Sequence, residues 1–253
     1  MGSNPSSQRP SQVISVVPNR RLTQNPENQF ELKYYRSILR VEHRGSTGTA
    51  FFLKIPDGPN GQFTYGIIAP TQIIQRCTRN MLQMIRFFSK HNLPQFSAND
   101  VCEAENMIFR TRDPAYNGTF LKISPPFYER IRDHVIFLRP LNGPLLESTN
   151  VAVYQYNQNE GKVSPGRIIE PLYRRNFILH DAQTSEGALG APVLDTKGNL
   201  IAMQLCEIIR GKEMGMAERM EDFADAISQR FSSSPAHNPV QETSENTGGT
   251  ITT

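Results

Sequence analysis

The strongest constraint on the fold is a series of short apolar segments, several with a two-residue period, separated by clusters of turn-forming residues. Residues 37–43 alternate in this way, the segment 49–55 follows, PDGPNG occupies 56–61, and a further apolar segment spans 63–69. A strand, a turn and a second strand predict a hairpin. Further strands are expected at 106–111, 120–123, 134–139, 151–156, 167–171, 176–181, 191–195 and 200–206. Short strands at this spacing predict an all-β barrel or sandwich.

Two segments show the period of a helix instead. Between 71 and 90, apolar residues at helical spacing predict an amphipathic helix that begins near Thr71 and ends before Pro94. A second amphipathic helix, docked on the β structure, is expected over 216–231. Its apolar stripe consists of Met220, Phe223, Ala224, Ile227 and Phe231.

Both ends of the chain have the composition of disordered segments. Residues 1–29 are rich in Ser, Pro, Asn, Gln and Arg, and residues 232–253 contain almost no large apolar side chain. Such segments bury too little apolar surface to offset the entropy lost on ordering. We therefore expect one folded domain over 30–231 between two disordered tails.

Composition narrows the class of protein. The net charge of the 253 residues is +3, which argues against a dedicated nucleic-acid binder and favours a protein or peptide partner. No apolar run reaches the length of a membrane span, and the N-terminus has no apolar signal region. Three cysteines make a poor disulfide framework, so a cytoplasmic location is expected. His and Cys spacing predicts no metal site, and no cofactor is expected.

The segment 187–193 reads GALGAPV and precedes a tight hairpin around Asp195 to Asn199. It resembles the nucleophile segment of trypsin-like (chymotrypsin-fold) serine proteases. Upstream, GTAFFL at 48–53 resembles an early strand of the same family, and GIIAPTQII at 66–74 resembles the strand that carries the general base. DHVIFL at 133–138 resembles the segment with the orienting acid. The resemblance covers about 35–231 and implies two six-stranded β-barrels, with the 71–90 helix as an insertion and a C-terminal helix.

The resemblance places Gln72 at the base position, Asp133 at the acid position and Leu189 at the nucleophile position. If the register slips by one residue, Thr71 takes the place of Gln72. An amide is no base near neutral pH, and a leucine has no nucleophilic atom. The resemblance therefore implies a pseudoprotease, in which Asp133 is a partly buried carboxylate that the Gln72 amide satisfies.

Other residues could in principle restore chemistry, which leaves an active hydrolase with a non-standard nucleophile as an alternative. Ser185 is expected to be a local hydrogen bonder and Cys206 a small buried hydrophobe. His134 is expected on a strand, facing away from Asp133, and His180 is expected to be an ordinary strand histidine.

The resemblance also implies how such a protein binds. Gly187, Ala188 and Gly190 would be the remnant of the oxyanion turn. In this family substrates add as a strand beside the segment after the nucleophile turn, so the candidate peptide edge is Ala202, Met203, Gln204 and Leu205. An open alternative is that residues 210–215 cover this edge and that partners use another face.

A second alternative is binding of RNA or an acidic partner to a basic face of the 71–90 helix. That face would carry Arg76, Arg79, Arg86 and Lys90, extended by Arg110, Arg112, Arg130, Arg132, Arg174 and Arg175. At the N-terminus, Met1-Gly2-Ser3-Asn4-Pro5-Ser6 fits the pattern for myristoylation of Gly2, and contact with a membrane is expected only if Gly2 is lipidated.

Overall fold

A computed structural model describes residues 34–57, 62–74, 79–90, 93–103, 107–110, 117–157, 160–173, 176–209 and 213–232. The expected tails, the candidate lipidation site Gly2 and the basic residues Arg76, Arg112, Arg174 and Arg175 lie outside these ranges. Within them, no helix combines the length and the apolar character that crossing a membrane requires.

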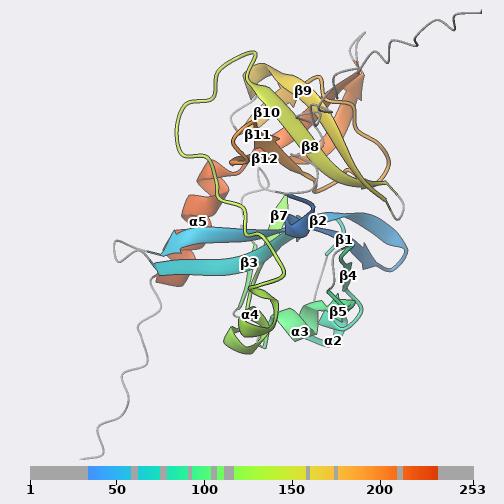
Figure 1. Ribbon diagram of the computed structural model, residues 1–253, viewed down its shortest axis with the longest axis vertical. Coiled ribbons are helices and arrows are strands. Elements are labelled where there is room, and N and C mark those ends of the chain that lie inside the picture. The colour runs from blue at the N-terminus through green and yellow to red at the C-terminus, as the bar shows by residue number, and fades with distance from the viewer. Residues whose placement is uncertain are drawn as a thin grey trace, which may run out of the picture.

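The first half of the chain forms a seven-stranded antiparallel sheet that curves into a half-barrel (Figure 1). Its strand order is β5-β4-β1-β2-β3-β7-β6. The strands are β1 (Ile38–His43), β2 (Ser46–Asp57), β3 (Gln62–Pro70), β4 (Arg86–Phe88), β5 (Phe96–Ser97), β6 (Ile108–Arg110) and β7 (Gly118–Lys122). Four short helices accompany them: η1 (Tyr35–Ser37), α2 (Arg79–Leu82), α3 (Ala98–Val101) and α4 (Pro125–Ile131).

The second half forms a closed barrel of six strands in the order β10-β13-β12-β11-β8-β9. These are β8 (Asn150–Asn157), β9 (Glu160–Tyr173), β10 (Phe177–His180), β11 (Pro192–Asp195), β12 (Leu200–Ile209) and β13 (Glu213–Arg219). The helix α5 (Glu221–Ser232) follows the last strand. The expected all-β architecture of two bodies with a C-terminal helix is confirmed, as one half-barrel and one closed six-stranded barrel.

Strand β2 is buried on both faces because its alternate side chains enter two different cores. Phe52 lies in the core inside the half-barrel, together with Leu39 and Ile67. Phe51 and Leu53 lie in a second core, which the closed barrel also enters through residues such as Tyr154. This second core joins the two bodies through a shared hydrophobic contact.

Helix α5 completes the second core. Met220, Phe223, Ala224 and Ile227 are buried there, and Phe231 packs against it while partly exposed. The stripe expected from the sequence is therefore confirmed, but the helix begins at Glu221 and not at 216. Residues 216–219 instead end strand β13, where they pair with β10 and β12.

The prediction of a long helix over 71–90 is wrong for the described part of that range. Residues 71–74 form turns, α2 has only four residues, and Arg86–Phe88 is the strand β4, paired with β1. Strand pairing is favoured over the helix because it buries Phe87 completely. Met84, expected on the apolar stripe of the helix, is 50% exposed. The basic helix face does not form, and Arg86 and Lys90 are exposed on separate segments.

Of the expected strand 134–139, residues 135–139 are extended but do not form a ladder strand. This segment makes one-residue bridges, in which Leu138 donates to the carbonyl of Phe52 at 3.0 Å and Lys54 donates back to Leu138 at 3.0 Å. Asp133 and His134 lie before it, in the turn that follows α4. The segment then continues as the connection between the two bodies.

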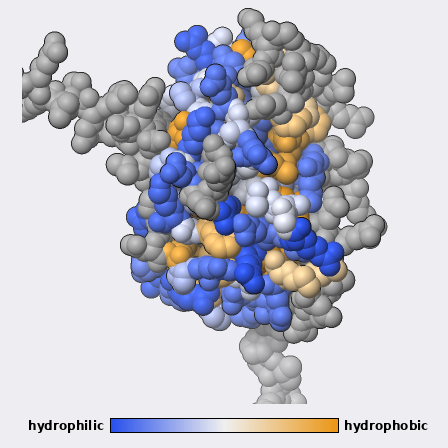
Figure 2. Space-filling view, turned by 90° about the vertical axis from the view of Figure 1, so that its right-hand side faces the viewer, coloured by the Kyte–Doolittle hydropathy of each residue, from blue (hydrophilic) through white to orange (hydrophobic). Residues whose placement is uncertain are grey.

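The face on the right-hand side of Figure 1 is mainly hydrophilic, and the apolar residues that reach the surface there gather in separate patches (Figure 2). This distribution agrees with a fold that buries its large apolar residues in the cores described above.

We expect Phe223→Ala to lower the free energy of unfolding by about 3–5 kcal/mol, because it removes a fully buried ring from the shared core. Chemical denaturation measures this. Asp225→Ala is the matched control, since Asp225 is exposed on the same helix and is repelled by Glu221 and Asp222. A loss below 1 kcal/mol for Phe223→Ala would contradict a core shared by both bodies.

Candidate functional site

The turn between β10 and β11 contains the segment 187–193 that resembles a nucleophile turn in the sequence, and we call it the nucleophile turn. Ala188 donates to the carbonyl of Ser185 at 2.9 Å, and Ala191 donates to Ala188 at 2.8 Å. Gly187 and Gly190 have φ angles of +94° and +86°. A Cβ at Gly187 would lie 2.3 Å from the carbonyl oxygen of Tyr156, so glycine is required there both for its backbone angle and for space.

Thr49 of β2 clamps this turn to the half-barrel. Its backbone N–H donates to the carbonyl of Leu189 at 2.9 Å, and its hydroxyl donates to the carbonyl of Gly187 at 2.9 Å. The same hydroxyl oxygen accepts the backbone N–H of Tyr156 in β8 at 3.0 Å. Thr49 is fully buried, so these bonds form away from water and fix the turn between the two bodies.

Leu189 therefore stands at the centre of the turn, where the resemblance places the nucleophile. Its side chain is partly buried and packs against the core inside the half-barrel. Ala188 and Gly190 beside it are buried. The expected remnant of the oxyanion turn is thus a folded, glycine-dependent turn with an apolar side chain at its centre.

The candidate base position lies directly after β3. Thr71 donates its backbone N–H to the carbonyl of Asn117 at 2.6 Å, and its hydroxyl lies 2.9 Å from the hydroxyl of Thr119. Gln72 is exposed, and Ile73 and Ile74 return into the core. Pro70 lies beside the nucleophile turn, since a Cβ at Gly190 would meet the Pro70 ring at 2.4 Å.

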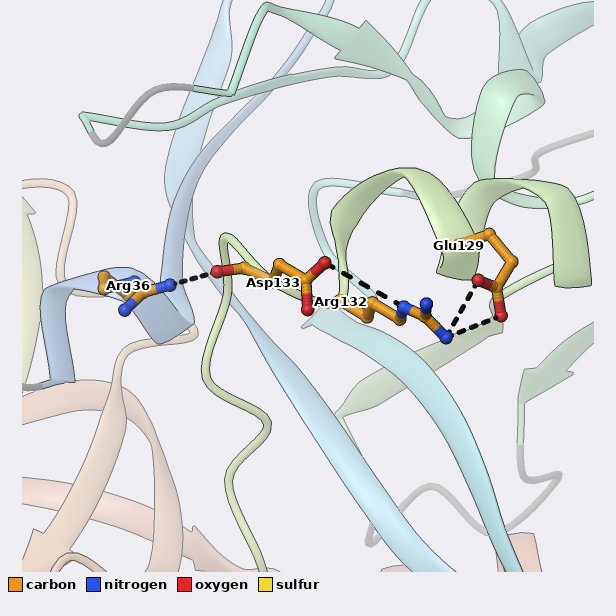
Figure 3. A network of polar contacts seen from close by, with 4 residues as sticks. All are labelled: Arg36, Glu129, Arg132 and Asp133. Carbon is orange, nitrogen blue, oxygen red and sulfur yellow. Dashed lines mark hydrogen bonds and ion pairs between the residues drawn. The ribbon is translucent and has the colours of Figure 1, made fainter.

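The expectation that Asp133 is a partly buried carboxylate held by Gln72 is wrong. The Asp133 side chain is 85% exposed, and its carboxylate lies 4.0 Å from the guanidinium of Arg132. Arg132 also pairs with Glu129, while Arg36 donates to the Asp133 carbonyl at 2.6 Å (Figure 3). Asp133 lies in the turn that follows α4 and does not begin a strand, which is why it lies outside the base turn.

Asn117 is the polar residue that the structure places at the base turn. It immediately precedes β7, which pairs with β3 so that Gly118 lies opposite Pro70. Its carbonyl accepts from Thr71, and its own N–H donates to the Glu218 carboxylate at 2.7 Å. The sequence signal for Asn117 was a polar residue just before the apolar segment 118–123. The sequence analysis instead placed Asp133 at the acid position.

Glu218, on β13, links the closed barrel to Asn117 beside the base turn. The side chain is fully buried, one oxygen accepts the Asn117 N–H, and the other, Oε1, has no hydrogen-bond partner. Burial raises the pKa of Glu218 to about 7, although the hydrogen bonds from Asn117 favour the ionised form. Glu218 is therefore a proton-binding group at the junction of the two bodies.

This raised pKa predicts that stability falls as the pH rises. Between the unfolded value of 4.5 and about 7, the folded state binds the Glu218 proton more tightly than the unfolded state. The protonated form therefore stabilises the fold at low pH, and this contribution is lost as the pH rises through 7. Its full size is on the order of 3 kcal/mol.

Glu218→Gln tests this account. Relative to the wild type, the variant should gain up to about 3 kcal/mol of unfolding free energy between pH 4.5 and values above 7. Denaturant titrations across this pH range measure the difference. Glu147→Gln, at an exposed carboxylate, is the control and should track the wild type. A parallel pH profile for Glu218→Gln and the wild type would show that Glu218 is not the group responsible.

A pocket of about 270 Å³ adjoins the nucleophile turn. Its lining comes from the turn itself and from the strand β12. The lining residues are Thr184, Ser185, Glu186, Gly187, Ala188, Leu189, Gln204, Leu205 and Cys206. Glu186 is the one charged residue among them, so the lining is largely neutral.

Two buried glutamines support the pocket. The Gln155 amide oxygen accepts the backbone N–H of Ser185 at 3.0 Å and its hydroxyl at 3.2 Å, while its amide nitrogen donates to Ser164 at 3.0 Å. The Gln204 amide donates to the Cys206 carbonyl at 2.9 Å. Its oxygen lies 2.7 Å from the His180 ring nitrogen Nε2, which donates in this arrangement.

The candidate peptide edge begins later than expected. Ala202 and Met203 are buried and paired on both sides, with β11 and β13. Gln204 also exchanges backbone hydrogen bonds with Gly190 and Ala191, both at 2.8 Å. Only after a register shift between Gln204 and Cys206 does β12 pair with β13 alone among the described strands, so the edge starts at Leu205. The alternative cover, 210–215, falls partly outside the described residues, and Glu213–Gly215 belongs to β13.

Of the residues considered as substitutes for the triad, Ser185 and Cys206 both line the pocket, whereas His134 and His180 are not part of its lining. The Ser185 hydroxyl donates to an amide oxygen, not to a base. His134 is exposed after α4, and His180 is fully buried, where burial lowers its pKa. Cys206 is exposed at the pocket, not buried as expected. In the described ranges, no group of three or more His, Cys, Asp or Glu is arranged to hold a metal ion.

The fold can now be compared with solved structures. The Rv3671c protease of M. tuberculosis H37Rv, as the inactive form of a serine-to-alanine mutant, matches with a TM-score of 0.57 and 16% identity, over 87% of this chain and 97% of its own. A human pathogenic astrovirus serine protease matches with a TM-score of 0.52 and 14% identity, over 76% and 94%. The serine endoprotease of Yersinia pestis gives 0.59 and 14%, over 81% and 66%.

The chain has the trypsin-like, two-barrel fold. At these identities the likeness shows the fold alone. No protein-family model matches the chain, and no curated protein sequence matches it either.

Proposed function

We propose that this chain is a catalytically inactive protein of the trypsin-like fold. It would use the pocket beside the nucleophile turn to bind an extended segment of a protein partner. The observation that carries the proposal is Leu189, held at the centre of an otherwise well-formed nucleophile turn. Acyl transfer in this fold needs a hydroxyl or thiol at that point, and an apolar side chain offers neither.

The base position supports the same conclusion. Gln72 carries an amide, which takes up no proton near neutral pH. In the alternative register, the Thr71 hydroxyl is engaged with Thr119. Neither residue can accept a proton from a nucleophile at position 189.

We also propose that Asn117, and not Asp133, occupies the acid position. Asn117 lies beside the base turn through its bond to Thr71, whereas Asp133 is exposed at the end of α4. An asparagine side chain is uncharged, so it cannot stabilise an imidazolium as a carboxylate does. On this assignment all three positions lack the required group.

The geometry needed to bind a peptide does not depend on the three missing catalytic groups. The pocket of about 270 Å³ lies between the turn and Leu205, next to the point where β12 pairs with β13 alone. An extended peptide beside Leu205 and Cys206 would add a strand and place one side chain in the pocket. Because the lining is mainly neutral and Glu186 is exposed at the pocket, an apolar or uncharged side chain fits better than an acidic one.

The wild-type protein should show no labelling by a fluorophosphonate probe, which reacts with activated serines. Restoring the three groups together, as Q72H/N117D/L189S, should produce labelling at position 189, because the turn is already folded around it. The control Q72H/N117D/L189A lacks only the hydroxyl. Labelling of the wild type that Ser185→Ala abolishes would contradict inactivity and would identify the nucleophile.

Peptide binding is tested by selecting ligands from a displayed random-peptide library. Leu205→Lys should weaken the selected peptides at least tenfold, because it puts a charge into the mainly neutral pocket wall. Leu146→Lys is the matched control, since Leu146 is 69% exposed and lies outside the pocket. Isothermal titration calorimetry measures both. Equal affinity of the two variants would place the binding surface elsewhere.

A further inference from the structure

Two cations share one aromatic ring on the half-barrel, away from the pocket. The ammonium of Lys54, on β2, lies 5.6 Å from the centroid of the Phe63 ring on β3. The guanidinium of Arg139, in the connection between the two bodies, lies 5.2 Å from the same centroid. Such contacts hold both positive charges against the ring.

The two charges repel each other. Burial lowers the pKa of Lys54, and the nearby charge of Arg139 lowers it further. Within the described ranges, no ion pair involves either residue; the acidic partners present there belong to Arg40, Arg132 and Arg219. An anion between Lys54 and Arg139 would relieve this repulsion.

Hydroxyl groups and half-buried rings surround the pair. Tyr65 lies opposite Lys54 in the β2–β3 ladder, and its hydroxyl bonds to that of Tyr128 on α4. The Tyr65 ring contacts Tyr128 at 4.5 Å, Phe137 at 4.9 Å and Phe63 at 6.3 Å between centroids. The surface therefore combines two cations, hydroxyl donors and aromatic rings.

We propose that this Lys54–Arg139 site binds the phosphate backbone of single-stranded nucleic acid. The two non-bridging oxygens of one phosphate can accept from the ammonium and the guanidinium together. The exposed guanidinium plane and the half-buried rings give an unpaired base a surface for stacking. A carboxylate peptide would use the charges but not the rings, so the combination favours nucleic acid.

A second phosphate can follow the connection toward η1. Arg36 is exposed and donates to the carbonyls of Asp133 and His134 at 2.6 and 2.9 Å (Figure 3), and none of the ion pairs between described residues includes it. It lies at the start of the extended segment that ends at Arg139. The site is distinct from the basic helix face considered from the sequence.

The test measures fluorescence anisotropy of a short labelled single-stranded RNA with the full chain over a range of potassium chloride concentrations. K54Q/R139Q should reduce affinity at least tenfold and make the slope of log K against log salt shallower by about 0.7, the value for the loss of one phosphate contact. The control R167Q/K197Q removes two exposed cations from the closed barrel and should match the wild type. Thermal melting confirms that both variants fold.

Three results would overturn the proposal. One is absence of wild-type binding even at low salt. Another is an equal loss of affinity in the two double variants, which would indicate an effect of net charge alone. The third is tighter, Lys54-dependent binding of polyglutamate than of RNA, which would mean that the site takes carboxylates. In the supporting case, RNA binding also raises the pKa of Lys54, measured by NMR of its ammonium group.

Discussion

The clamp by Thr49 is the interaction on which the nucleophile turn and the pocket beside it depend. One buried side chain and its own N–H hold two carbonyls of the nucleophile turn, and the hydroxyl also accepts from β8. The turn is therefore fixed to the half-barrel while it leads into β11 of the closed barrel. Without these bonds, the partly buried carbonyls of Gly187 and Leu189 would lose these partners, and Gly187 and Gly190 would no longer be held at their positive φ angles.

The same clamp fixes the backbone of the nucleophile turn independently of the side chain at position 189. It acts through backbone atoms of the turn, so it places position 189 equally well whichever side chain stands there. Leu189 can then pack against the half-barrel core, and the pocket beside it keeps its walls and its glutamine supports. A site built in this way can lose its nucleophile and keep a binding surface, which is the basis of the function proposed above.

The strand periodicity predicted most of the fold, because alternation reports burial directly. The prediction of a 71–90 helix was wrong because turns, a four-residue helix and β4 bury Ile73, Ile74, Ile85 and Phe87 without a continuous helix. The segment 187–193 was singled out because it resembles the nucleophile segment of trypsin-like serine proteases, and the structure adds that Gly187 and Gly190 have positive φ angles. The place of Asn117 beside the base turn was not predicted because it depends on the pairing of β7 with β3. The inner position of Ala202 to Gln204 depends on the pairing with β11, and local sequence reveals neither pairing.

The structure of the protein bound to a peptide selected from a library, after prolonged incubation, tests the central claim most directly. The account predicts an uncleaved peptide, extended beside β12 from Leu205 onward, with one side chain in the pocket next to Leu189. A cleaved peptide, or a peptide seated on another surface, would contradict it.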